Sequence, residues 1–460
     1  MIDLFPVVKL TLGILITFFV GYNIIKALSW SNLKIMGSLE IVFLSFPIGI
    51  SVITLQMFIL AIFGKGWSLF NMALPWVFLL LVNLAVFFMR KRRPAEPQAA
   101  RSALDFVEKA LICGIILQVI WVTLKAFALP IEAPDAIAIY ALKAKAFYLK
   151  GGMDHDILKN VTFKDSHQDY PLLLPLAECW IYRALGNLND FLAKALFPIF
   201  FLSATGIFYS MLKRFIKRRG SLLFTFMLAS VPQFTVFGTN AYADLPLTCY
   251  YTASLLYLFL WMKEKETPYL LLSALMSFSA AWTKNEGSML LVINILILAI
   301  FLARDKMRFV KKAISLSVYL AVVIVLLLPW ISFKNSMALE SDIVNKATIT
   351  PSNVGANLGR VWPILYEYQK HLFGPKRWNI AWISVLVVFI LKIRNVFRDE
   401  IGYIAFAAIL CIAGYTFIYI VTPHDLGWHL STSASRLMLH VLPVSMFWLA
   451  LSTKKDLNLF

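Results

Sequence analysis

Long apolar runs without a charged side chain constrain this sequence more than any other feature. A clear example is LSVYLAVVIVLLLPW at residues 316–330. Such a run indicates a helix that crosses a bilayer, because a helix satisfies its own backbone hydrogen bonds in lipid. An outer-membrane β-barrel would instead show segments of about ten residues with alternating polarity. We therefore expect an all-α polytopic membrane protein.

Composition and charge agree with this fold class. Of the 460 residues 60% are hydrophobic and 15% are charged, whereas a soluble domain has about 45–50% apolar and about 25% charged residues. The net charge of +18 comes from clusters between apolar runs, where Lys and Arg set topology and meet anionic lipids. No basic stripe alternates with exposed aromatics, so we expect no nucleic-acid partner. The four cysteines lie inside apolar runs without metal-ligand spacing and are interpreted as buried hydrophobes.

Thirteen apolar segments come close to the roughly 20 residues that a crossing requires. They are residues 5–25, 39–63, 70–89, 107–128, 191–212, 221–238, 245–262, 268–283, 287–303, 313–332, 379–393, 401–421 and 438–453. Basic clusters such as MRKRR at 89–93 and KRFIKRR at 213–219 fall on one side if the chain starts outside. Because cytoplasmic loops are enriched in Lys and Arg, we place the N-terminus outside and the C-terminus inside.

The order of spans and loops suggests three parts. Residues 1–93 form an N-terminal three-span module, 94–105 a cytoplasmic linker rich in charge, Pro and Ala, and 106–460 the main transmembrane module. Two long outer loops, 129–170 and 333–378, contain periodic apolar residues that predict short helices at the membrane surface. Loops of this length are usually functional or disordered, so we expect the chemistry at the outer face.

The shorter apolar segment PLLLPLAECWIYRALGN at residues 171–187 does not fit as a full crossing. We expect it to form a helix in the outer interface. Its Trp180, Tyr182 and Arg183 would then lie at the lipid headgroups.

The first outer loop carries two candidate sites. Asp135 follows the fourth span directly, where it either caps a helix or contributes a functional carboxylate. His167 and Asp169, in DSHQDYPLLLPL, end the same loop. They could bind a metal, orient a sugar or simply be polar surface groups.

Three further candidates lie in short turns at the outer ends of spans. Asp244 in NAYADLPL is either a turn residue or a site acid, since an acid at the head of a span is costly unless paired or wet. Lys284 and Glu286 in AAWTKNEGSML form either a structural turn or a second site. Arg436 begins the last predicted span, after His429 and the small residues STSAS.

The role of Arg436 has two interpretations. An arginine at the interface can extend its charge to water, or it can bind a phosphate through two parallel hydrogen bonds. His440, one turn further on, is interpreted as a buried structural residue. Together these positions place acids and cations at outer turns, whereas the inner turns are mainly basic.

From about residue 105 to 455, the sequence resembles the GT-C superfamily of polyprenyl-phosphate-dependent glycosyltransferases. It is most similar to the branch of protein O-mannosyltransferases and lipid A aminoarabinose transferases. The resemblance rests on the order of segments: Asp135 with Tyr140 five residues later, HQDYPLLLPL, YADLPL, WTKNEG and SASRLMLHVLP. Two features depart from the family plan. Ala136 follows Asp135 where the family usually has a second acid, and the first three spans have no counterpart.

The resemblance implies an inverting hexosyl- or pentosyltransferase. Its donor would be a sugar on a polyprenyl phosphate, and its acceptor the hydroxyl of a glycan, glycolipid or protein. Asp135 would be the general base, and Arg436 and Lys284 would bind the phosphate. Substrate-binding residues would be His167, Asp169, Tyr140, Asp244, Lys284, Glu286 and His429.

The same resemblance implies an integral protein of the plasma membrane, such as a bacterial inner membrane, with its site facing the periplasm or exterior. It leaves a divalent metal possible. The main alternative is a transporter or flippase of a lipid-linked or anionic substrate. We find neither the paired repeats nor the midplane helix breaks that are typical of transporters. A non-catalytic scaffold would not account for the one-sided acids.

Overall fold

The computed structural model describes residues 5–29, 36–89, 103–341, 343, 345 and 347–454. These residues form helices and contain no strand, so the predicted all-α polytopic class is confirmed. Ten helical segments of this part of the chain are long and apolar enough to cross a membrane. They are α1 (Phe5–Leu28), α2 (Ser38–Ile62), α3 (Leu69–Met89), α4 (Phe106–Ala128), α8 with α9 (Asp190–Ala193, Leu196–Leu212), α12 (Asp244–Glu264), α14 (Asn285–Arg304), α15 (Phe309–Ser336), α20 (Gly402–Val421) and α21 (Leu426–Thr453).

The remaining three predicted spans are shorter helices. The segment 268–283 is α13 (Thr267–Thr283), which packs along α12, and 379–393 contains α19 (Ala381–Leu391). The segment 221–238 is broken into α10 (Arg218–Ala229) and α11 (Pro232–Phe237). Pro232 explains the break, because proline disfavours a helical conformation in the residue before it. Val231 accordingly has an extended backbone.

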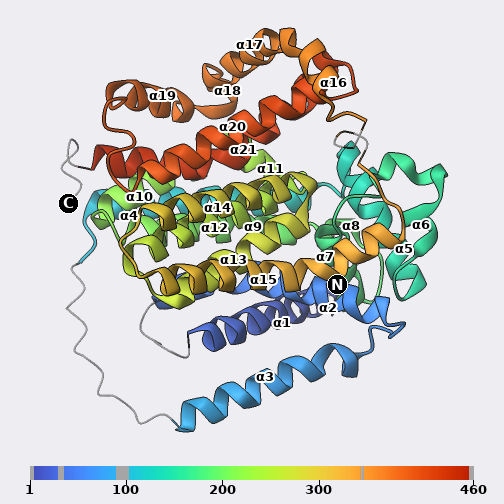
Figure 1. The fold of residues 1–460 in the computed structure, drawn as a ribbon. Coiled ribbons are helices and arrows are strands. Elements are labelled where there is room, and N and C mark those ends of the chain that lie inside the picture. The colour runs from blue at the N-terminus through green and yellow to red at the C-terminus, as the bar shows by residue number, and fades with distance from the viewer. Residues whose placement is uncertain are drawn as a thin grey trace.

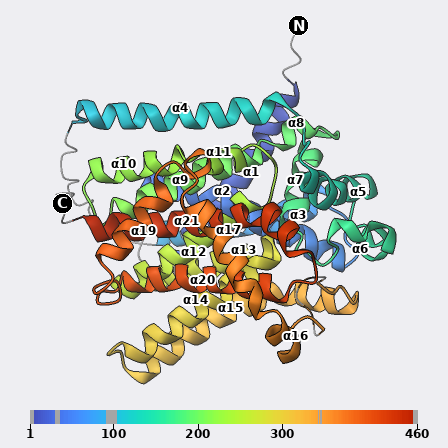
Figure 2. The same cartoon turned by 90° about the horizontal axis from the view of Figure 1, so that it is seen from above.

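The long helices lie side by side, and the first long loop forms a cap of short helices at one end of the bundle (Figure 1, Figure 2). The core centres on α12, whose apolar window is completely buried, and α12 contacts α9, α13 and α21. Helices α3 and α4 lie at the periphery and are largely exposed. The α1–α2 crossing depends on Gly21 and Gly49. A Cβ at Gly21 would lie 1.8 Å from the carbonyl oxygen of Ser45, as expected where small residues let membrane helices approach closely.

One end of the bundle, which we call the loop end, carries the short helices. The first loop contains η1 (Ala136–Ala141), α5 (Leu142–Lys150), α6 (His155–Lys159) and η2 (Val161–Ser166), and leads to α7 (Leu173–Leu185). The second loop begins at this end with α16 (Pro351–Ala356) and η3 (Leu358–Arg360), and continues along the side of the bundle with α17 (Val361–Leu372) and α18 (Pro375–Trp378) (Figure 1). The predicted short helices in both long loops are therefore present.

The other end, which we call the basic end, carries the charged connections. They include residues 213–219 between α9 and α10, and 304–312 between α14 and α15. Here the carboxylate of Glu108 on α4 pairs with Arg218 at 2.6 Å, and Glu40 on α2 pairs with Arg214 at 2.8 Å. These pairs join helices that are distant in sequence.

The first two helices pack into the main bundle, since α2 contacts both α9 and α7. The hydroxyl of Ser51 on α2 lies 2.7 Å from that of Ser279 on α13. Tyr250 on α12 donates a hydrogen bond to the Pro47 carbonyl. Most of the predicted linker, residues 94–102, lies outside the described residues.

Two predictions about helix positions are wrong. Helix α21 begins at Leu426, so Arg436 lies about three turns inside it and does not open it. The hydroxyl of Thr432 donates a hydrogen bond to the carbonyl of Trp428 within the helix. The polar residues STSAS at 431–435 therefore belong to the helix. Tyr182 on α7, which is predicted from the sequence to lie at the lipid headgroups, is instead inside the protein. It is buried and donates to Asp190 at 2.7 Å.

Candidate functional site

The site begins with a pair formed by residues from opposite ends of the sequence. Asp135 precedes η1, and its carboxylate accepts a hydrogen bond from the Arg436 guanidinium on α21. Asp135 occupies a helix-cap position but its side chain makes no capping hydrogen bond. Its side chain is 35% exposed and that of Arg436 is 17% exposed. The carboxylate therefore faces both the guanidinium and an open side.

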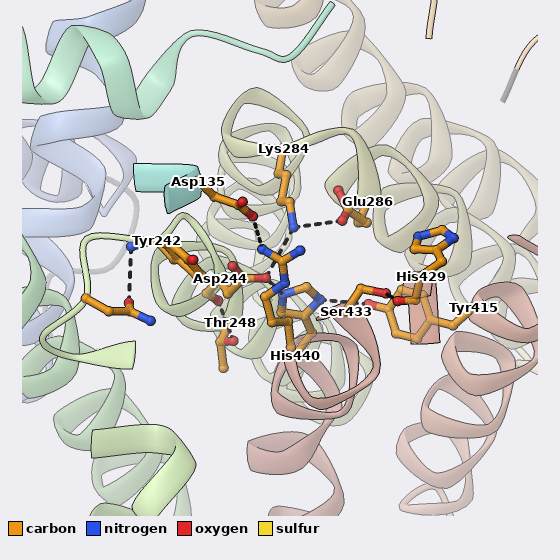
Figure 3. Close-up of polar contacts among 12 residues, drawn as sticks. Asp135, Tyr242, Asp244, Thr248, Lys284, Glu286, Tyr415, His429, Ser433 and His440 are labelled. Atoms are coloured by element: carbon orange, nitrogen blue, oxygen red, sulfur yellow. Dashed lines mark hydrogen bonds and ion pairs between the residues drawn. The ribbon is translucent and has the colours of Figure 1, made fainter. Parts of the chain in front are cut away.

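Behind this pair lies a buried network of charged side chains (Figure 3). The Lys284 ammonium lies 3.2 Å from Asp244 Oδ1 and 2.8 Å from Glu286 Oε1. Asp244 is 1% exposed and Lys284 is 5% exposed. Each buried charge thus has an opposite charge in contact, as burial requires. The second Glu286 oxygen, Oε2, is buried without a hydrogen-bond partner.

His440 extends the network into the bundle. Its Nε2 donates to Asp244 Oδ1 at 3.0 Å, and its Nδ1 lies 3.0 Å from the hydroxyl of Tyr415. These two contacts fix the orientation of the imidazole ring, since each ring nitrogen has its own partner. From the sequence alone, His440 is interpreted only as a buried structural residue. A detectable signal was its position four residues after Arg436, which places both on one face of a helix.

The chain reaches these positions through very short connections. A single residue, Lys284 in extended conformation, links α13 to α14. Gly287 makes this connection possible, because a Cβ there would lie 1.8 Å from the carbonyl oxygen of Ala280. Asp244 begins α12, and its side chain points to Lys284 and His440 instead of capping the helix.

A second polar group connects the first loop to α14. Asp169 Oδ2 accepts a hydrogen bond from Asn285 at 2.6 Å and lies 3.8 Å from the Lys334 ammonium. The backbone carbonyl of His167 accepts from the buried Lys143 at 2.7 Å. Burial lowers the pKa of Lys143 to about 7, although the nearby Asp169 acts in the opposite direction. Asp169 is therefore connected to the charged network through Asn285, the residue before Glu286.

The remaining two predicted site residues occupy different surroundings. Tyr140 is buried in η1, and burial raises the pKa of its phenol. The η1 segment is a π-helix, a rare conformation that is frequent at functional sites. His429, two turns before Arg436 on α21, lies 3.0 Å from the Thr422 hydroxyl and packs against Tyr419.

Within the described residues, no group of three or more His, Cys, Asp or Glu side chains has the arrangement of a metal site. The carboxylates of the network instead contact Arg436, Lys284 and His440. These groups can hold an anion and accept a proton close to each other.

Comparison with known proteins matches part of this site to a family. The model of the dolichyl-phosphate-mannose-protein mannosyltransferase family matches residues 174–333, and this family is part of the GT-C superfamily. The resemblance to GT-C glycosyltransferases is confirmed. The match supports a membrane glycosyltransferase with a polyprenyl-phosphate sugar donor. It includes Asp244, Lys284 and Glu286, whereas Asp135 and Arg436 lie outside it. No curated protein and no solved structure gives a significant match.

Proposed function

We propose that this protein transfers a hexose or pentose from a polyprenyl phosphate to an acceptor hydroxyl at the loop end, which faces the outside of a plasma membrane. The observation that carries the proposal is the contact between Asp135 and Arg436 beside the buried network. It places a proton acceptor and an anion-binding cation side by side. Sugar transfer from a lipid phosphate requires both groups at once.

In the proposed reaction the acceptor oxygen attacks the anomeric carbon while the bond from that carbon to the phosphate oxygen breaks. The acceptor proton passes to Asp135, and the polyprenyl phosphate leaves with the electron pair. A single displacement of this kind inverts the anomeric configuration. A positioned general base contributes about 10²–10⁴ in rate.

Arg436 has hydrogen-bonding capacity for the leaving phosphate. Nη1 donates to Asp135, and Nε is buried without a hydrogen-bond partner in the described part of the chain. The planar guanidinium can therefore hold the base through one edge and a phosphate through the other. Because negative charge grows on the phosphate as the bond breaks, this contact strengthens in the transition state.

Lys284 contributes a second positive charge but is shared between Asp244 and Glu286. We propose that it acts on the phosphate together with Arg436, and that Asp244 and His440 hold it in position. Asp169, Tyr140, Glu286 and His429 are proposed to contact the sugar or the acceptor. The acceptor is a hydroxyl of a glycan, glycolipid or protein.

The test is turnover of a radiolabelled polyprenyl-phosphate sugar by the purified full-length protein. We expect Asp135→Asn to reduce turnover by about 10²–10⁴ while leaving the melting temperature close to wild type, because the amide oxygen can still accept from Arg436. Asp165→Asn, which changes an exposed acid of the same loop, is the matched control and should keep full activity. Near-normal turnover by a folded Asp135→Asn protein would contradict the proposed base.

A further inference from the structure

A groove at the loop end lies among the N-terminal helices, between α1, α3 and α7, with a volume of about 290 Å³. Its lining comes from α1 (Lys9, Leu12, Gly13, Ile16), α2 and the following turn (Met57, Trp67), α3 (Leu69, Met72) and α7 (Trp180, Arg183, Ala184). None of the charged groups described in the candidate site belongs to this lining. It is therefore a separate feature that the proposed sugar transfer does not use.

The lining of this groove contains two cations and no carboxylate. The Lys9 ammonium donates to the Leu185 carbonyl at 3.1 Å, and the Arg183 guanidinium donates to the Trp67 carbonyl at 2.8 Å. Both partners are neutral backbone oxygens, so neither positive charge is neutralised by its partner. By contrast, Arg214 and Arg218 at the basic end pair directly with glutamates. An anion bound in the groove would neutralise the positive charges of Lys9 and Arg183.

The floor and walls of the groove are held rigidly. Trp67 is 3% exposed, and its indole donates to the Met57 carbonyl at 2.7 Å. The Arg183 guanidinium lies over this indole ring, 5.6 Å from its centroid. Trp180 donates to the Thr17 hydroxyl at 3.2 Å. The α1–α7 contact is close, because a Cβ at Gly13 would lie 2.7 Å from the Ala184 side chain.

Helix α3 forms the outer wall and is held to α2 by polar contacts at this end. Gln56 on α2 donates to the carbonyls of Asn71 and Met72 and accepts from the Trp76 indole at 2.7 Å. On the open side the apolar residues Leu12 and Leu69 are exposed, at 54% and 83%. The groove thus combines charged donors with apolar walls that face the lipid.

We propose that this groove binds the phosphate headgroup of an anionic lipid, with the acyl or prenyl chain along α1 and α3. Tryptophans gather where a membrane meets water, and Arg and Lys side chains bind phosphate oxygens through charge-assisted hydrogen bonds. Both conditions are met by Trp67 and Trp180 with Lys9 and Arg183. The first three helices thereby acquire a function, since they build a lipid site on the outside of the main bundle.

The experiment is a titration of the full-length protein in detergent with dioleoyl phosphatidylglycerol, read by native mass spectrometry. We expect the first phosphatidylglycerol to bind about 25-fold more tightly than dioleoyl phosphatidylcholine, because each of the two basic groups contributes about fivefold. The double variant Lys9→Gln with Arg183→Gln should lose this preference. The variant Lys9→Arg with Arg183→Lys should keep it. The control Lys376→Gln with Arg377→Gln changes two exposed cations of α18 and gives the same change in net charge without effect.

A second variant keeps the proposal testable if the double variant does not fold. Ile16→Trp fills the groove from its exposed side and should also abolish tight binding while the melting temperature stays unchanged. Unchanged phosphatidylglycerol binding in either folded variant would overturn the proposal. Competition with undecaprenyl phosphate identifies the source of the headgroup. Displacement at lower concentration assigns the site to a prenyl phosphate, and its failure assigns it to a phospholipid.

Discussion

At the scale of single residues, the position of Arg436 determines what the site can do. Three carboxylates, Asp135, Asp244 and Glu286, contact two permanent cations. The carboxylates of this group therefore outnumber its permanent cations by one. The excess decreases when Asp135 takes up a proton from the acceptor. Proton transfer to Asp135 would therefore free positive charge for the phosphate at the moment when the leaving group becomes more negative.

This coupling predicts a specific effect of Arg436→Lys. Lysine keeps the charge but lacks the planar fork that can contact Asp135 and a phosphate together. We expect kcat to fall by about 10²–10³ with a smaller change in the KM for the donor, since the lost contact acts mainly in the transition state. Steady-state kinetics with saturating acceptor measure both constants. Arg377→Lys on the exposed surface of α18 is the control, and wild-type kinetics in Arg436→Lys would show that the fork is not required.

Lys143 makes a prediction about pH. Its pKa is about 7 in the folded protein because burial disfavours the charged amine, whereas it is about 10.4 in an unfolded chain. Between these pH values the unfolded state binds one more proton than the folded state. The stability cost of burying Lys143 therefore decreases as the pH rises, by up to about 1.4 kcal/mol per pH unit.

The measurement compares melting temperatures of wild type and Lys143→Met from pH 6 to pH 9. We expect the wild type to gain stability relative to the variant as the pH rises above about 7. A constant difference across this range would show that Lys143 does not titrate there. Lys150→Met, at the exposed end of the same helix, should show no such trend.

At the scale of elements, the tight connection between α13 and α14 holds Lys284 and Glu286 against Asp244. Gly287→Ala would place a methyl group 1.8 Å from the Ala280 carbonyl oxygen, and backbone atoms would have to move. Overpacking of this kind costs about 1–3 kcal/mol. We expect a lower melting temperature and a loss of transfer, because the displaced backbone carries Lys284. Gly355→Ala, whose Cβ would meet open space, should leave both properties unchanged, and a Gly287→Ala protein with normal stability would contradict the packing argument.

The sequence predicts elements better than it predicts contacts. Apolar length identified most of the spans because the bilayer imposes it, but hydropathy alone did not detect the helix break before Pro232 or the early start of α21. The positions of Asp135, Asp244 and Lys284 at helix ends, and the predicted position of Arg436 at the start of the last span, suggested a shared face. Their pairing depends on how helices distant in sequence pack, which one sequence does not contain. The partner of His440 could not be predicted for the same reason, since a buried histidine in a helix gives no sign of the carboxylate opposite it.

At the scale of the whole molecule, the two ends of the bundle differ in chemistry. The loop end carries the charged network and the groove of the N-terminal helices, and the basic end carries the clusters between helices. Both proposed sites therefore open at the same end. A donor lipid with its phosphate at that surface would reach the network from the side. The orientation of the bundle thus decides on which side of the membrane the sugar is transferred.

The enrichment of Lys and Arg in cytoplasmic loops predicts that the basic end lies inside the cell. Single cysteines at Lys150 in α5 and Ser352 in α16, both exposed at the loop end (Figure 1), should react with a membrane-impermeant maleimide in intact cells. Cysteines at Lys217 and Lys306, both exposed at the basic end, should react only after the cells are permeabilised. The background is Cys113→Ser, because Cys113 is the exposed one of the four native cysteines. The reverse labelling pattern would place the charged network in the cytoplasm, and a donor presented on the outer leaflet could then not reach Asp135 and Arg436.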